Sequence, residues 1–142
     1  MTRRSAVPVG AFLAWTIFVW GIVRVRNIVG DAAMTSSAQT RSLLLATSLW
    51  LPALVLLIVL LVAVLRHRPP PQPARFGVAL LGVWTVLVWL VRAYDIALVS
   101  DRDLPFIAVH VVLAVISVGL AALAARALRP QVRDRTPQSV AT

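Results

Sequence analysis

The chain has 142 residues, of which 60% are hydrophobic and only 13% are charged. Soluble domains carry about 25% charged residues, so this deficit predicts a protein whose solvent is lipid. The chain contains no cysteine, which excludes disulfides, iron–sulfur clusters, thiolate metal sites and cysteine nucleophiles. The net charge is +9, but the arginines flank apolar runs and follow no single face, so we expect no nucleic-acid partner.

Four apolar runs predict four transmembrane helices, at residues 7–29, 42–65, 76–99 and 104–126. A bilayer core about 30 Å thick needs about 20 helical residues. We interpret the first run as a retained helix and not as a cleaved signal peptide, because it is long and ends in arginine where small residues are expected. The predicted fold is therefore an all-α membrane protein of one domain with four spans.

The connecting segments predict the orientation. Residues 66–75 are rich in proline and arginine and indicate a stiff linker, and we expect the polar tail at 127–142 to be disordered. Nine of the fourteen arginines lie at the N-terminus, in this linker and in the tail, whereas four of the five aspartates lie on the other side. Because arginine is enriched in cytoplasmic segments, we expect a multi-pass protein of the plasma membrane with both termini in the cytoplasm.

An internal repeat is also indicated. The sequence WTIFVW at residues 15–20 matches WTVLVW at residues 84–89, and an Arg-x-x-Asn stretch follows the first match. An Arg-x-x-Asp stretch follows the second, after a slip of one residue. Chance recurrence of common apolar residues is the alternative, but the matched polar residues favour two tandem helical hairpins, related by an axis along the membrane normal.

Two stretches carry a resemblance to a known family. Residues 26–31 read RNIVGD and residues 105–113 read PFIAVHVVL. Together with the tryptophan pairs, they resemble a family of small actinobacterial integral membrane proteins of unknown function. Those proteins are shorter hairpins that carry both stretches, whereas here the stretches are split between the two halves. The resemblance implies a membrane location and no particular activity.

Several polar residues are predicted at membrane depth. Antiparallel packing predicts a cluster of Arg24, Asn27, Arg92, Asp95 and His110 near the outer face. One interpretation is that the arginines extend to the interface and mark the helix ends. The other is that Arg92 is buried and pairs with Asp95, one helical turn away. His110 is either a packing contact between helices or a proton-accepting or ligand-contacting partner of Asp95.

The last helix has small residues at every fourth position, Ser117, Ala121 and Ala125. Such a face suits close packing inside the bundle or between protomers. The tryptophans Trp15, Trp20, Trp84 and Trp89 could line a cofactor or quinone site, but anchoring and packing of the helices is favoured, because this is their usual role in membranes. Phosphate-binding, metalloprotease and nucleophile-elbow motifs do not occur, so no catalytic residue, cofactor or metal site is predicted.

These observations favour a non-enzymatic interaction or accessory component of the membrane, with the lipid bilayer, itself or another membrane protein as partners. The alternative is a transporter or channel unit for a small solute or ion, which would use Arg92, Asp95 and His110. An enzyme acting on lipid is the least favoured class, because no nucleophile with a nearby base is visible.

Overall fold

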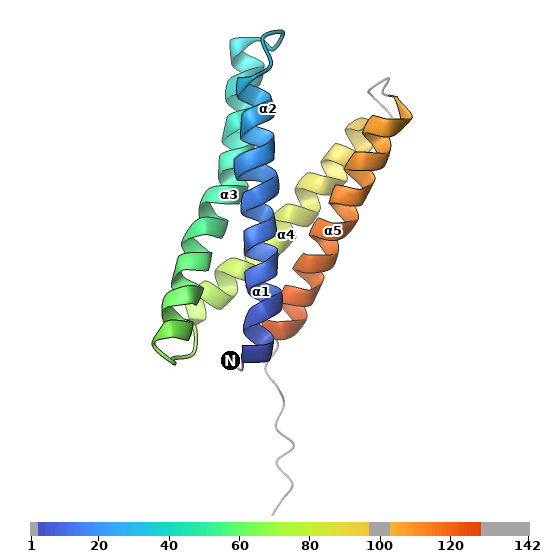
Figure 1. The fold of residues 1–142 in the computed structure, drawn as a ribbon. Coiled ribbons are helices and arrows are strands. Elements are labelled where there is room, and N and C mark those ends of the chain that lie inside the picture. Colours follow the sequence, from blue (N-terminus) through green and yellow to red (C-terminus); the bar gives the residue numbers. More distant parts are fainter. Residues whose placement is uncertain (1–2, 97–102, 129–142) are drawn as a thin grey trace, which may run out of the picture.

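The computed structural model describes residues 3–96 and 103–128. All regular structure in these two ranges is helical, and the chain runs through two antiparallel hairpins (Figure 1). Within these ranges, four helices are long and apolar enough to cross a membrane, which confirms the predicted all-α fold with four helices of membrane-spanning length. The tail from residue 129 and the predicted end of the third helix at 97–99 lie outside the described residues.

The first long helix consists of three consecutive parts. These are α1 (Arg3–Thr16), the π-helix η1 (Ile17–Arg24) and α2 (Val25–Val29). Thr16 and Val25, which border η1, keep right-handed helical backbone angles, so the chain continues from part to part as one rod. A π-helix forms i→i+5 hydrogen bonds and therefore takes one residue more per turn than an α-helix. Hydropathy does not distinguish the two geometries, so this element was not predicted.

The second long helix, α3 (Ser36–Leu65), begins at Ser36 and not at residue 42. The hydroxyl of Thr35 accepts a hydrogen bond from the Ala38 N–H at 3.4 Å and so caps the helix. At 1.5 Å per residue, the 30 residues span about 45 Å, which is longer than a bilayer core of about 30 Å. The additional first turns are polar, which is why an apolar pattern does not find them.

The second hairpin consists of α4 (Gln72–Tyr94) and α5 (Leu104–Leu128). Helix α4 begins inside the stretch predicted as a linker, so the connection from α3 covers residues 66–71 only. Proline is favourable in the first turn of a helix because its missing N–H would have no partner there, and Pro73 occupies this turn. The linker therefore ends four residues earlier than the proline pattern indicates.

The hairpins contact each other mainly through two helix pairs, α1 with α5 and α3 with α4. The N-terminus, the 66–71 turn and the end of α5 lie at one end of the molecule, which we call the N-terminal end (Figure 1). The hairpins diverge toward the opposite end, where α2 meets α3 (Figure 1). The core of the bundle contains residues from all four long helices, including Phe12, Leu49, Ala53, Leu81 and Ala124.

Candidate functional site

Two hydrogen bonds between tryptophan and serine join the hairpins. The indole N–H of Trp15 in α1 donates to the hydroxyl of Ser117 in α5 at 3.0 Å. The indole N–H of Trp84 in α4 donates to the hydroxyl of Ser48 in α3 at 3.1 Å. The first helix of each hairpin is thus hydrogen-bonded to the second helix of the other, and such bonds hold helices together inside a bilayer.

A tryptophan pair connects the first helices of the two hairpins. Trp20 of η1 and Trp89 of α4 are only 4% and 5% exposed. Their ring centroids lie 5.9 Å apart at an interplanar angle of 62°, which is a favourable edge-on arrangement. This contact fixes the position of the residues that follow it on both helices.

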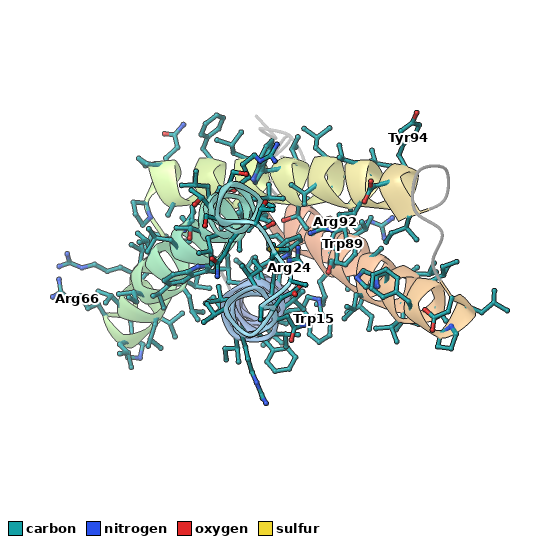
Figure 2. All side chains as sticks on the ribbon, turned by 90° about the horizontal axis from the view of Figure 1, so that it is seen from above. Trp15, Arg24, Arg66, Trp89, Arg92 and Tyr94 are labelled. Carbon is teal, nitrogen blue, oxygen red and sulfur yellow. The ribbon has the colours of Figure 1, made fainter. Side chains whose placement is uncertain are left out.

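Arg24 and Arg92 each lie about one turn beyond this tryptophan pair, and both side chains are half-buried. Their positive charges are close enough to repel each other, and Arg92 is attracted by the half-buried Asp95. Seen from above, Arg24, Trp89 and Arg92 lie together between the helices, whereas Tyr94 points outward (Figure 2). The three charged groups together carry a net charge of +1.

The same region contains hydrogen-bond donors that have no acceptor. In the described part of the chain, three buried side-chain N–H groups lack a partner, those of Arg24 Nε, Trp50 Nε1 and Trp89 Nε1. Trp50 packs against η1, since a Cβ atom placed on Gly21 would lie 3.3 Å from its Cβ. Buried donors in native proteins are normally bonded, so the unpaired N–H groups of Arg24 and Trp89, together with Arg92, define the candidate site.

The other predicted site residues have different surroundings. Asn27 is exposed on α2. His110 is half-buried. Its Nδ1 lies 2.8 Å from the carbonyl oxygen of Phe106 and donates a hydrogen bond to this oxygen when the ring is protonated at Nδ1. The two rings also stack at a centroid distance of 4.0 Å. The structure thus brings Arg24, Arg92 and Asp95 together and engages His110 within its own helix.

The predicted packing face of α5 is largely covered inside the chain. Ser117 and Ala121 are 2% and 6% exposed, whereas Ala125 is exposed and Ala124 is buried in its place. A helix with 3.6 residues per turn returns to the same face after seven residues and not after eight. Ala124, seven residues after Ser117, therefore shares its face, and Ala125 does not. Ala121 faces Gly82 of α4, where an added Cβ would lie 3.8 Å from the alanine Cβ.

Sequence reasoning did not identify the tryptophan N–H groups as part of the site. Trp20 and Trp89 lie in the repeated hexapeptide, and this repeat was a signal that they occupy equivalent positions. Trp50 has no counterpart in the sequence pattern, and only its packing against Gly21 shows where it lies.

Chemically, the cluster can donate hydrogen bonds and neutralise negative charge. Covalent catalysis needs a nucleophile beside a base, and within the cluster Asp95 is the one group that could serve as either. In the part of the chain that the structure describes, no three His, Cys, Asp or Glu side chains are grouped so that they could hold a metal ion. No family model matches the chain, and no curated protein or solved structure matches it.

Proposed function

We propose that the protein is a non-enzymatic accessory component of the plasma membrane that binds a helix of another membrane protein. The observation that carries this proposal is an apolar groove of about 620 Å³ between α3 and α4. Association of helices in a bilayer is driven by close packing and hydrogen bonds, and a concave wall offers more packing contact than a flat one. The groove is lined by Ser48, Leu51, Pro52, Val55, Leu56, Gly77, Leu80, Leu81 and Trp84.

Site-specific photocrosslinking in the native membrane tests this proposal. A benzophenone amino acid is placed at Val55 or Leu80 in the groove and, as matched controls, at Val115 or Leu123 on the exposed side of α5. We expect a discrete protein adduct from the groove positions and none from the controls. An adduct of twice the chain's mass would identify a second copy as the partner, while lipid adducts alone at all four positions would contradict the proposal.

A transport unit is the second candidate function. The observation in its favour is a group of charged residues at the contact between the two hairpins, which is where transporters built from repeats bind their substrates. Asp95 would be the charge-carrying site of the transporter, and Arg92 and His110 would tune its carboxylate. Flux into liposomes should then fall for Asp95→Asn and His110→Ala, while Asp103→Asn, at an exposed residue, serves as the control. Absence of flux with the unmodified chain would eliminate this candidate.

We also propose that the chain is a duplicated hairpin whose halves are related by an axis along the membrane normal. Trp84 lies 69 residues after Trp15, and Ser117 lies 69 residues after Ser48. Each tryptophan donates to the serine of the other half, which is the reciprocal pattern of a two-fold interface. Trp20 and Trp89 have the same separation and touch each other, as equivalent residues next to such an axis do.

The π-helix supports this proposal, because it accounts for the one-residue slip. Arg24 follows Trp20 by four residues, whereas Arg92 follows Trp89 by three. The wider turn of η1 absorbs the additional residue, so both arginines follow their tryptophans by about one turn. The halves thus keep equivalent positions in space in spite of unequal spacing in sequence.

Two single-residue deletions test the equivalence. Deleting Val23 from η1 gives the first half the spacing of the second, so we expect an ordinary α-helix and little loss of stability. Deleting Leu90 from α4 should rotate Arg92 by about 100° and destabilise the protein. Both residues are at least partly exposed, at 37% and 61%. Equal damage from the two deletions would argue against duplication.

For the orientation, we propose that the N-terminal end of the molecule faces the cytoplasm, because it carries most of the arginines. The absence of cysteine allows a clean test with single cysteines at the exposed Ala33 and Pro69. A membrane-impermeant maleimide should label Ala33→Cys in intact cells and Pro69→Cys only after lysis, and the opposite result would reverse the orientation. The family resemblance fits this membrane location and adds no activity to the proposal.

A further inference from the structure

The environment of Arg24 is unusual for an arginine that merely extends to the interface. Such a side chain keeps its charged group in contact with water or lipid headgroups. Here the Nε of Arg24 is buried and has no hydrogen-bond partner, although the residue as a whole is only half-buried. An unpaired buried donor on a charged group is costly. The buried Nε of the guanidinium therefore lacks a hydrogen-bond acceptor, while the rest of the group remains accessible to a ligand that supplies one.

The unpaired donors of this region come from three helices. Trp89 is 5% exposed, and its indole N–H lacks a partner. It precedes Arg92 by one turn of α4 and is held by the edge-on contact with Trp20. Trp50 of α3, also with an unpaired N–H, packs against Gly21 three residues before Arg24. Figure 2 shows Arg24, Trp89 and Arg92 together between the helices.

The charge of the cluster determines which ligand fits. Arg24 and Arg92 repel each other, and Asp95 compensates only one of the two charges, so one negative charge is missing. A phosphodiester carries one negative charge, and guanidinium groups bind phosphate oxygens through paired hydrogen bonds. Its oxygens can accept hydrogen bonds from several donors at once, which one indole and two guanidinium groups require.

The depth of the cluster fits the same ligand. Five residues of α2 follow Arg24, which is about 7.5 Å of helix. The arginine therefore lies just inside the edge of the span, and the phosphate groups of lipids lie just outside the hydrocarbon core. A long side chain covers this distance, and the acyl chains of a lipid would lie along the apolar helices below.

We propose that Arg24 and Arg92, together with the indole N–H of Trp89, bind the phosphodiester of an anionic lipid where the hairpins diverge. The bound anion accepts hydrogen bonds from these donors and separates the two repelling guanidinium groups. The lipid site lies within one chain, so this inference does not depend on the partner helix proposed for the groove between α3 and α4.

The test is native mass spectrometry of the full chain, purified in a neutral detergent and supplied with phosphatidylglycerol or with phosphatidylcholine. We expect phosphatidylglycerol to be retained in preference. Arg24→Met and Arg92→Met should each weaken retention by about tenfold or more, because hydrogen bonds to charged groups are the stronger ones. Arg26→Met is the matched control, since it removes the same charge from an exposed position two residues from Arg24.

Two further measurements complete the test. Trp89→Phe keeps an aromatic ring beside Trp20 but removes the N–H together with part of the indole, so it should also weaken retention. Soluble glycerophosphoglycerol distinguishes the sources, because binding of this compound without any retention of lipid would identify a soluble phosphodiester as the ligand. The proposal is overturned if neither compound binds, if phosphatidylcholine is retained equally well, or if Arg26→Met loses as much lipid as Arg24→Met.

Discussion

The two bonds between tryptophan and serine allow a direct measurement of the solvent around the helices. Their lengths are nearly equal, 3.0 Å for Trp15–Ser117 and 3.1 Å for Trp84–Ser48. Their locations differ, because Ser117 is 2% exposed whereas Trp84 is 40% exposed at the molecular surface. In water, a surface bond adds little stability because water competes for both partners. In a bilayer, the surface is covered by hydrocarbon, which offers no competing partner.

We therefore expect the two bonds to contribute equally to the free energy of unfolding. Hydrogen bonds between transmembrane helices contribute about 0.6 kcal/mol on average and up to about 1.7 kcal/mol. Double-mutant cycles with Trp→Phe and Ser→Ala isolate this coupling energy for each pair. Each single change, Ser117→Ala or Ser48→Ala, leaves an indole N–H unpaired where no water replaces the lost acceptor, at about 1–3 kcal/mol.

The assay is unfolding by SDS in mixed micelles, followed by circular dichroism, with the four chains of each cycle measured in parallel. The two cycles share no residue, so their coupling energies should add when combined. A normal coupling for Trp15–Ser117 with none for Trp84–Ser48 would refute the reasoning. That result would mean that the surface between α3 and α4 is wet and does not face lipid.

The remaining predictions concern packing and charge, and the same SDS titration measures them. Gly77→Leu should destabilise the protein by about 1–3 kcal/mol through overpacking, because a Cβ at Gly77 would already lie 3.0 Å from the Cδ2 of Leu56. Gly10→Leu should be tolerated, since nothing lies within 4 Å of its added Cβ, and equal losses from the two changes would contradict the packing described. Arg24→Met, measured without anionic lipid, should stabilise the protein by about 1 kcal/mol, because it removes an unpaired buried donor and the repulsion with Arg92. A lower midpoint for this variant would show that the charge is needed for folding.

Hydropathy predicted the four apolar helices and the start of α5 at Leu104, but not where the other three helices begin. An apolar pattern reports which residues face lipid, whereas a helix begins where its first N–H groups find a cap. Thr35 caps α3 ahead of polar turns, and the proline-rich stretch that predicts a linker is compatible with the first turn of α4. Both differences arise because helical structure and burial in lipid are separate properties.

The candidate site was predicted in part. Depth along the helices was sufficient to group Arg24, Arg92 and Asp95, since all three lie near the same end of the spans. Depth does not determine rotation about a helix axis, and this is why the sequence could not show that His110 turns to its own helix. The π-helix was indicated only by the one-residue slip in the repeat, because its identity depends on backbone hydrogen bonds that any apolar sequence can form.

The bond between Trp15 and Ser117 also has a consequence for how the chain is made. Its two residues are 102 positions apart, and ribosomes add about 5–20 residues per second. The acceptor of Trp15 is therefore synthesised roughly 5–20 seconds after the donor, when the first hairpin is already complete. During this interval the face of α1 that will receive α5 is uncovered, and the nascent hairpin is open to incorrect association with neighbouring chains until its own last helix arrives.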